Sequence, residues 1–206
     1  MFLFAAGRSG NTKSLGLEKV GVRTKRRELI EVDGDYRTAV PHIFAVGDVI
    51  GFPSLASTSM DQGRVAVAHI FDLHDIEHIA TVFPYGIYTI PEISMVGTTE
   101  EEAHTQGIDY LVGRAHHRDM PRGKIMGVEN GFLKLVFRRA DKVIMGVHII
   151  GPLASELIHY GVTLVENATT LDQVISKIFN FPTLHDLYKY ASYDGLGNLA
   201  GHKIKS

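Results

Sequence analysis

The chain has no cysteine and no tryptophan among its 206 residues. Without a thiol it cannot form a disulfide or carry out thiol chemistry with its own side chains. The formal net charge is only −2, which gives no reason to expect nucleic acid or an anionic membrane surface as a partner. No apolar run approaches the ~20 residues of a membrane-spanning helix, and the N-terminus lacks the basic region of a signal peptide. We therefore expect a cytoplasmic protein with neither nucleic acid nor membrane as a partner.

Length and composition are those of an ordinary folded protein. Hydrophobic residues make up 45% and charged residues 21% of the chain, and its length suffices for one or two domains. His69, His74 and His78 are close in sequence, and the last two have the spacing that places two imidazoles on one helix face. Because a helix here is expected to end near Phe71 and no third ligand is evident, we expect no metal site.

The most informative segment lies between residues 36 and 50. Residues 43–46 are consecutively apolar, which predicts a short strand buried on both faces, as in a parallel sheet. Gly47 permits close approach of a ligand or another backbone segment. Asp48 places two hydrogen-bond acceptors at the carboxyl end of the strand, where open α/β sheets bind ligands. Such a carboxylate can accept a hydrogen bond from a ribose or ribityl hydroxyl. In the alternative interpretation, Gly47 and Asp48 only form a turn after a core strand.

A helix is predicted over residues 55–71, after a Pro-Ser pair that can start it. Its first residues are Leu55, Ala56 and Ser57. The start of a helix offers free backbone N–H groups and a partial positive charge, which favour an electron-rich ligand group. In the alternative interpretation Ser54 is simply the N-cap.

From about residue 82 the sequence alternates between short strands and helices. Thr99 and Glu102 form a capping box that opens a short helix, and apolar residues at helical spacing predict an amphipathic helix over residues 152–166. Strands are expected at residues 85–90, 110–116, 131–137 and 142–150. Strands with helices on one face predict an α+β domain, which could also be free-standing with all of its apolar faces covered from within.

These blocks together resemble the C-terminal part of flavoproteins of the pyridine nucleotide-disulfide oxidoreductase family. Residues 2–6 are expected to form a buried strand, and the following Gly-Arg-Ser-Gly-Asn is similar to the end of the family's nicotinamide domain. The resemblance implies an α/β remnant of an FAD/NAD(P)-binding domain in residues 1–82, containing the second FAD-binding segment. It implies an α+β dimerisation (interface) domain in residues 83–206. No Gly-x-Gly-x-x-Gly follows a strand, so the cradle for the FAD pyrophosphate is missing from this sequence.

The resemblance also implies which residues hold the cofactor. In the family, the Asp that corresponds to Asp48 binds the ribityl chain of FAD, next to Gly47. The helix start at Leu55, Ala56 and Ser57 corresponds to the one that faces the pyrimidine side of the flavin. FAD and NAD(P) are therefore the cofactors expected for the complete protein, whereas this chain by itself is expected to be inactive and to hold neither.

One position near the C-terminus separates the kinds of enzyme in this family. Members that reduce disulfides carry His-x-His-Pro-Thr-x-x-Glu, in which the second His is the acid-base group and the Glu orients it. Here Phe181 stands at the position of that His and Asp186 at that of the Glu, so no catalytic residue is expected. His185 could act as a displaced base, and Thr183 could be the N-cap of a helix with Asp186 at its third position.

The resemblance thus implies a flavoprotein that transfers hydride between NADPH and NAD through FAD, a transhydrogenase, and forms a homodimer through residues 83–206. Direct hydride transfer needs no dithiol and no base for one. The alternatives are a disulfide oxidoreductase of the dihydrolipoamide dehydrogenase or mercuric reductase type and a non-catalytic dimerisation module. A redox Cys pair upstream of these residues would identify a disulfide oxidoreductase. The residues that determine the preference for NAD or NADP are expected to lie upstream as well.

Overall fold

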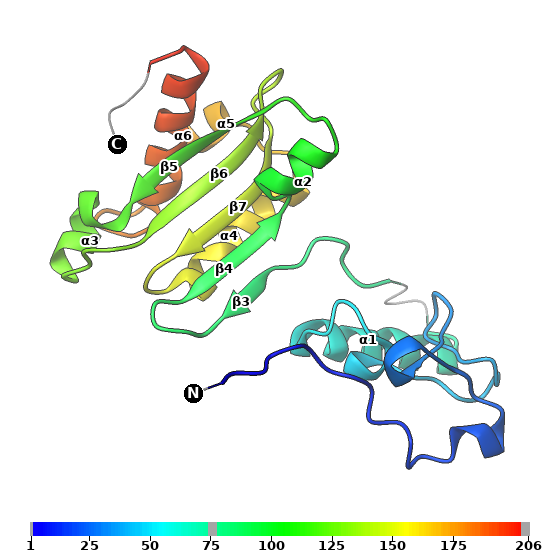
Figure 1. Cartoon of the computed structure of the whole chain (residues 1–206). Coiled ribbons are helices and arrows are strands. Elements are labelled where there is room, and N and C mark those ends of the chain that lie inside the picture. The colour runs from blue at the N-terminus through cyan, green and yellow to red at the C-terminus, as the bar shows by residue number, and fades with distance from the viewer. Residues whose placement is uncertain (1, 74–77, 203–206) are drawn as a thin grey trace. The chain divides into compact units, whose positions relative to one another are not determined.

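The computed structural model describes residues 2–73 and 78–202 of the chain. The chain divides into two compact units, Met1–Thr81 and Val82–Ser206 (Figure 1). Each unit has its own apolar core, a small one around Ile30 in the first and a much larger one in the second. None of the described helices combines the length and apolar character needed to cross a bilayer.

One long helix and several short elements make up the first unit. In chain order they are η1 (Leu17–Val20), β1 (Thr24–Lys25), η2 (Arg26–Glu28), β2 (Leu29–Ile30), η3 (Gly47–Ile50) and α1 (Ala56–Phe71). β1 and β2 form a two-stranded antiparallel ladder, and α1 packs against η3. The buried face of α1 includes Thr58, Gln62 and Val65, so a polar amide lies among its packing residues.

Two strands expected in the first unit do not form. Residues 2–6 have exposed side chains and pair with no described segment. Of residues 43–46, only Ala45 is buried, and Phe44 makes a single antiparallel bridge with Arg37. The prediction of strands buried on both faces was wrong for this structure, because such strands depend on hydrogen-bonded neighbours on both sides. The described residues contain no such neighbours.

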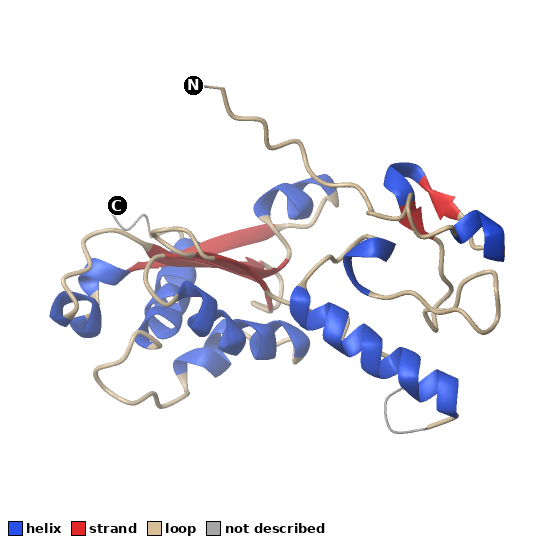
Figure 2. Cartoon of the chain, turned by 90° about the horizontal axis from the view of Figure 1, so that it is seen from below, coloured by secondary structure: helices blue, strands red, loops and turns tan. Residues whose placement is uncertain are grey.

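A five-stranded antiparallel sheet organises the second unit, with the strand order β3-β4-β7-β6-β5. The strands are β3 (Tyr85–Ile87), β4 (Ile93–Gly97), β5 (Tyr110–His116), β6 (Phe132–Arg138) and β7 (Ile144–Ile150). The helices are α2 (Glu100–Thr105), η4 (His117–Asp119), α3 (Pro121–Ile125), α4 (Ala154–Glu166), α5 (Leu171–Ile175) and α6 (Asp186–Leu199). α4 packs on β4 and β7, α6 packs on β5 and β6, and both cover the same face of the sheet (Figures 1 and 2).

The core lies between this face and the two long helices. Leu135 and Phe137 point inward from β6 and are fully buried. Tyr188 of α6 is equally buried, and its hydroxyl donates to the carbonyl of Leu157 at 2.7 Å and accepts the N–H of Gly161 at 3.1 Å. Because a buried hydroxyl needs hydrogen-bond partners, these two bonds fix α6 against α4.

α6 also covers part of the free edge of β5. A Cβ atom at Gly113 would lie 2.1 Å from a backbone oxygen of α6, so a glycine is required there. The carboxylate of Asp194 accepts the backbone N–H of Arg114 at 2.8 Å, and the side-chain amide of Asn198 donates to the carbonyl of Val112 at 2.9 Å. An unpaired strand edge tends to pair with other chains, and these bonds occupy part of this one.

Local sequence signals predicted this unit well. The strand expected at residues 110–116 is β5 with the same bounds, and the helix expected over residues 152–166 is α4. The capping box is confirmed: Thr99 accepts the N–H of Glu102 at 3.1 Å, and the carboxylate of Glu102 accepts the N–H of Thr99 at 2.8 Å. The bonds to Thr99 lower the pKa of Glu102.

A partly buried histidine lies on the other face of the sheet. His148 of β7 stands between Met95 of β4 and Lys134 of β6 in the ladder. Burial, reinforced by the charge of Lys134 and opposed by Glu100 and Glu102, lowers the pKa of His148 to about 4. Its imidazole is therefore neutral in the folded protein at neutral pH.

We expect acid to destabilise the protein through His148. The unfolded imidazole binds its proton near pH 6.5 and the folded one only near pH 4. The stability contribution is therefore complete above pH 6.5 and is lost as the pH falls toward 4. The loss amounts to roughly 1–3 kcal/mol, allowing for partial exposure. Urea unfolding between pH 7 and 4 should show a shallower pH dependence for His148→Gln than for wild type, whereas His104→Gln, at an exposed position of α2, should match wild type. Equal slopes for all three proteins would contradict this expectation.

Candidate functional site

The Gly47–Ile50 turn is anchored to α1 by one hydrogen bond. Gly47 has a φ of 81°, a conformation that favours glycine. Its backbone N–H donates to the side-chain oxygen of Gln62 at 2.7 Å, and Gln62 is only 3% exposed. A Cβ atom at position 47 would lie 3.4 Å from the hydroxyl of Ser59. Helix α1 thus sets the position of the turn that carries Asp48.

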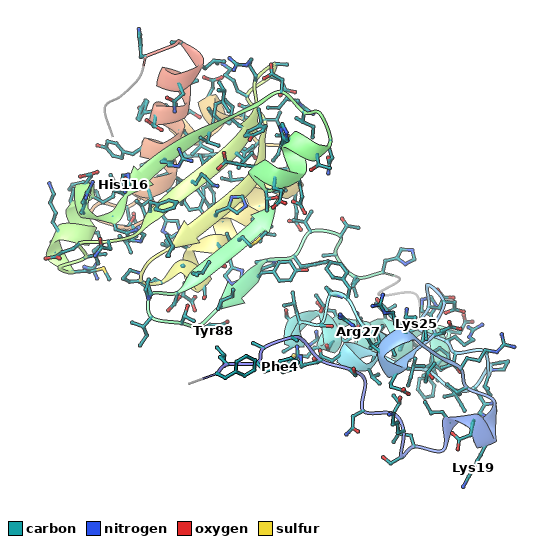
Figure 3. The ribbon with its side chains drawn as sticks, in the orientation of Figure 1. Phe4, Lys19, Lys25, Arg27, Tyr88 and His116 are labelled. Atoms are coloured by element: carbon teal, nitrogen blue, oxygen red, sulfur yellow. The ribbon has the colours of Figure 1, made fainter. Side chains whose placement is uncertain are left out.

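Asp48 faces a cavity of about 490 Å³ within the first unit. Its carboxylate lies 3.3 Å from a guanidinium nitrogen of Arg8, with side-chain exposures of 54% and 79% respectively. Arg27, Gly51 and Phe52 line the same cavity, and Arg27 comes from η2 (Figure 3). A solvent-accessible carboxylate beside a cavity can accept hydrogen bonds from ligand hydroxyls.

The start of α1 is not capped by any side chain. Leu55 is the N-cap residue and makes no side-chain cap. The hydroxyl of Ser54 donates instead to the carbonyl of Gly51 at 2.7 Å, so the interpretation of Ser54 as the N-cap was wrong. Ala56 and Ser57 are exposed, and their backbone N–H groups belong to the first turn, where a helix has no internal acceptors. This end can therefore receive an electron-rich ligand group.

The residues present suit part of a flavin dinucleotide. Asp48 offers acceptors for sugar hydroxyls, and the uncapped turn beginning after Leu55 offers donors and positive potential. Of the five residues expected to bind the cofactor, Asp48 alone lines the cavity, whereas Gly47, Leu55, Ala56 and Ser57 lie outside its lining. Gly47 contributes only indirectly, because its hydrogen bond to Gln62 of α1 holds the turn that carries Asp48. The first residues of α1 do not line the cavity.

The C-terminal loop places Phe181 at the surface of the second unit. Phe181 is 73% exposed. α6 begins at Asp186 with His185 as its N-cap residue and no side-chain cap. The buried hydroxyl of Thr183 and one buried carboxylate oxygen of Asp186 have no hydrogen-bond partner among the described residues. The interpretation of Thr183 as the N-cap was therefore wrong, and Phe181 has no group that can move a proton.

His185 lies in an aromatic cluster. Its ring centroid is 6.0 Å from that of Phe179, 6.2 Å from that of Tyr160 and 6.3 Å from that of Tyr188. Burial lowers its pKa, and the charge of nearby Asp186 opposes this shift. The imidazole is thus packed mainly against carbon, which is the setting of a structural histidine and not of a base held by a carboxylate.

The histidines considered for a metal site give no such site in the described part of the chain. His74 lies outside the described residues. His69 is 3.4 Å from Asp35. Within residues 2–73 and 78–202, no three His, Asp or Glu side chains are grouped so that they could hold a metal ion.

Sequence reasoning missed two residues of the site. Gln62 could have been found, because a Gln at helical spacing from Thr58 and Val65 stands on the buried side of α1 and a buried amide needs a partner. Arg27 carries no usable signal in the sequence, because a run of three basic residues at 25–27 is typical of a solvated loop. Only the folded chain brings it to the cavity of Asp48.

Sequence profiles of known families match both units. The profile described as pyridine nucleotide-disulphide oxidoreductase, dimerisation domain, matches residues 83–192. The profile described as pyridine nucleotide-disulphide oxidoreductase matches residues 1–63. The chain therefore belongs to the pyridine nucleotide-disulphide oxidoreductase family.

Similar curated proteins are soluble pyridine nucleotide transhydrogenases. That of Yersinia enterocolitica is 43% identical over 200 residues, which are 96% of this chain and 43% of the relative. That of Yersinia pestis is 44% identical over the same shares of the two chains. The chain thus spans less than half the length of these relatives.

Similar solved structures are also longer than this chain. LpdA from Mycobacterium tuberculosis matches with a TM-score of 0.79 and 30% identity, over 90% of this chain and 40% of that one. The HOCl-induced flavoprotein disulfide reductase RclA from Escherichia coli matches with a TM-score of 0.82 and 25% identity, over 89% of this chain and 43% of that one.

Replacing Gln62 should destabilise the site. Gln62→Leu leaves the N–H of Gly47 without its acceptor and should lower the free energy of unfolding of the first unit by about 1–3 kcal/mol. Hydrogen exchange at residues 47–51 should accelerate with it. Gln106→Leu, at an exposed position after α2, is the matched control and should change neither quantity. Unchanged exchange in Gln62→Leu would show that the bond does not hold the turn.

Proposed function

We propose that this chain is part of a flavoprotein transhydrogenase that moves hydride between NADPH and NAD. When bound, FAD supplies the carrier that accepts the hydride from one nicotinamide and passes it to the other. The observation that carries the proposal is Phe181, which stands where disulfide-reducing members of the family have their acid-base histidine. The identity of 43% to the transhydrogenase of Yersinia enterocolitica over 96% of this chain supports the same conclusion.

In this proposal the first unit supplies part of the flavin site. Residues 1–82 are the end of the NAD(P)-binding domain and the second FAD-binding segment. Asp48 accepts a hydrogen bond from a ribityl hydroxyl, and Gly47 keeps that carboxylate in place through α1. The N–H groups of the uncapped turn at residues 55–57 face the electron-rich pyrimidine edge of the flavin. The exposed carboxylate and the uncapped helix support these roles.

The second unit has the proposed role of dimerisation. Residues 83–206 would join two copies of the chain, as the description of the matched profile suggests. The exposed apolar side chains of Ile178 (95%) and Phe181 (73%) support a covered surface in an assembly. The name of the relatives is consistent with a place in the cytoplasm, which we also propose.

The reaction itself separates the proposal from its alternative. A disulfide reductase is favoured by the structural similarity to RclA, and Phe181 argues against it. The complete protein should transfer hydride from NADPH to an NAD analogue, with no NADPH oxidation when a disulfide is the only acceptor. Steady reduction of a disulfide without transhydrogenation would refute the proposal.

Loss of the Asp48 carboxylate should weaken flavin retention. In the complete protein, Asp48→Asn removes a charged acceptor but keeps the size of the side chain, and the dissociation constant for FAD should rise roughly tenfold. Flavin absorbance per protein after gel filtration measures the effect. Asp61→Asn, on the exposed face of α1 next to Arg64, is the control and should keep its flavin. Unchanged stoichiometry in Asp48→Asn would refute the role of this residue.

We expect the 206-residue chain to form dimers. Sedimentation equilibrium should give twice the 22.7 kDa of one chain, with dissociation only on dilution. An ideal monomer at every accessible concentration would contradict dimerisation through the second unit.

A further inference from the structure

Helix α6 occupies only part of the outer edge of β5. β5 is the last strand of the sheet, so its backbone groups that point away from β6 have no neighbouring strand. Asp194 of α6 accepts the N–H of Arg114. Asn198 of α6 donates to the carbonyl of Val112. The end of the strand at His116 (Figure 3) lies beyond both of these bonds.

Two backbone groups at this end are unpaired. In an antiparallel strand the N–H and the carbonyl of one residue point to the same side, so the carbonyl of Arg114 points outward with its N–H. The N–H of His116 also points outward, because that of His117 turns the other way and donates to Gly131, just before β6. Neither outward group has a hydrogen-bond partner in the part of the chain that the structure describes.

These two groups have the pattern that a parallel strand pair requires. In a parallel pair, one residue donates its N–H to the carbonyl before its partner and accepts the N–H after it. A residue placed opposite Ala115 would thus bond to the carbonyl of Arg114 and to the N–H of His116. Antiparallel addition needs both groups of the same residue. The N–H of Arg114 is already bound to α6, and the carbonyl of His116, the N-cap residue of η4, accepts the first bond of that helix.

A cavity of about 600 Å³ opens at these groups. Residues 114–116 line it, together with Tyr190 and Tyr193 of α6. The two tyrosines are 52% and 49% exposed, and their ring centroids lie 6.2 Å apart in an edge-to-face arrangement. Paired residues of neighbouring strands direct their side chains to the same face of the sheet. A residue paired with Ala115, which belongs to the core under α6, would therefore turn its side chain toward the tyrosines.

η4 contributes two further charges to this cavity. Arg118 and Asp119 line it and are exposed, and among the described residues neither forms an ion pair. The guanidinium of Arg114 is different, because it lies 3.5 Å from the carboxylate of Glu100. Arg118 is therefore the cation that is available to an acidic side chain of a ligand, and Asp119 opposes such a side chain.

We propose that this end of β5 binds an extended peptide segment of a partner protein. We call it the edge site, formed by residues 114–116, Arg118, Tyr190 and Tyr193. One residue of the segment pairs in parallel with β5 and packs an aromatic or large apolar side chain on the tyrosines, and an acidic neighbour binds Arg118. Addition of a strand to a free sheet edge is a known mode of peptide recognition, in which backbone bonds give affinity and side-chain contacts give specificity. The edge site involves neither flavin nor nicotinamide.

The peptide acetyl-Ser-Glu-Phe-Glu-Ser-amide tests the site on the 206-residue chain. NMR titration, which detects weak binding, should show shifts at the amides of residues 114–119 and 190–194. Methylation of the phenylalanine nitrogen removes the donor to Arg114 and should weaken binding about fivefold. The matched control is methylation of the nitrogen of the following glutamate, which points to solvent in this pairing, and it should leave the affinity unchanged. Equal losses with both methylated peptides would overturn the backbone pairing.

Two variants of opposite expected effect test the role of the charges. Arg118→Gln should weaken binding of the peptide about threefold at low ionic strength, and Asp119→Asn should strengthen it by a similar factor. Both effects should shrink as salt is added. Arg122→Gln removes an exposed charge of α3 that does not line the cavity, and it should bind like wild type. Tighter binding by Asp119→Asn cannot be explained by misfolding.

The remaining outcomes would overturn the proposal. Absence of shifts at residues 114–119 and 190–194 at the highest soluble peptide concentration would show that the edge site does not take an extended segment. An effect of Arg122→Gln as large as that of Arg118→Gln would reduce the contribution of charge to a general field and overturn the role of Arg118.

Discussion

The contact between the sheet and α6 is the constraint on which the second unit depends. Gly113 lets β5 approach α6 so closely that a Cβ atom there would lie 2.1 Å from the carbonyl oxygen of Ala191. Gly195 of α6 likewise leaves no room for a Cβ atom, which would lie 2.9 Å from the ring of Phe137 in β6. This approach brings the hydroxyl of Tyr188 to α4 and the carboxylate of Asp194 to the edge of β5. Packing, hydrogen bonding and edge protection thus follow from one close approach, and α6 in turn fixes one end of the loop that carries Phe181.

The first unit is held in a different way. Its small core leaves the position of the site to individual hydrogen bonds, above all the one from Gly47 to Gln62. Asp48 and Arg8 meet at a solvent-exposed pair, which contributes little stability by itself. Regions with few buried contacts open more easily than packed cores. A ligand bound at Asp48 would therefore stabilise this unit as well as bind to it.

The success of sequence-based prediction differed between the units for a physical reason. Strand β5 and the capping box of Thr99 depend on local alternation and on contacts three residues apart, and both were predicted correctly. Residues 43–46 have equally strong apolar character, yet they form one bridge and no ladder, because a strand also needs neighbours. The N-cap interpretations of Ser54 and Thr183 failed because a hydroxyl close to a helix start can bond elsewhere or remain unpaired.

The sequence by itself determined what chemistry this chain cannot perform: without cysteine it has no thiol, and Phe181 cannot transfer a proton. It also predicted a ligand-binding role for Asp48, since a glycine and an acid after an apolar run can be recognised locally. Only the tertiary structure decided that Arg8 and Arg27 share a cavity with that acid. These residues are separated by 19 or more positions in sequence, and their meeting depends on turns and long-range hydrogen bonds that no local periodicity encodes.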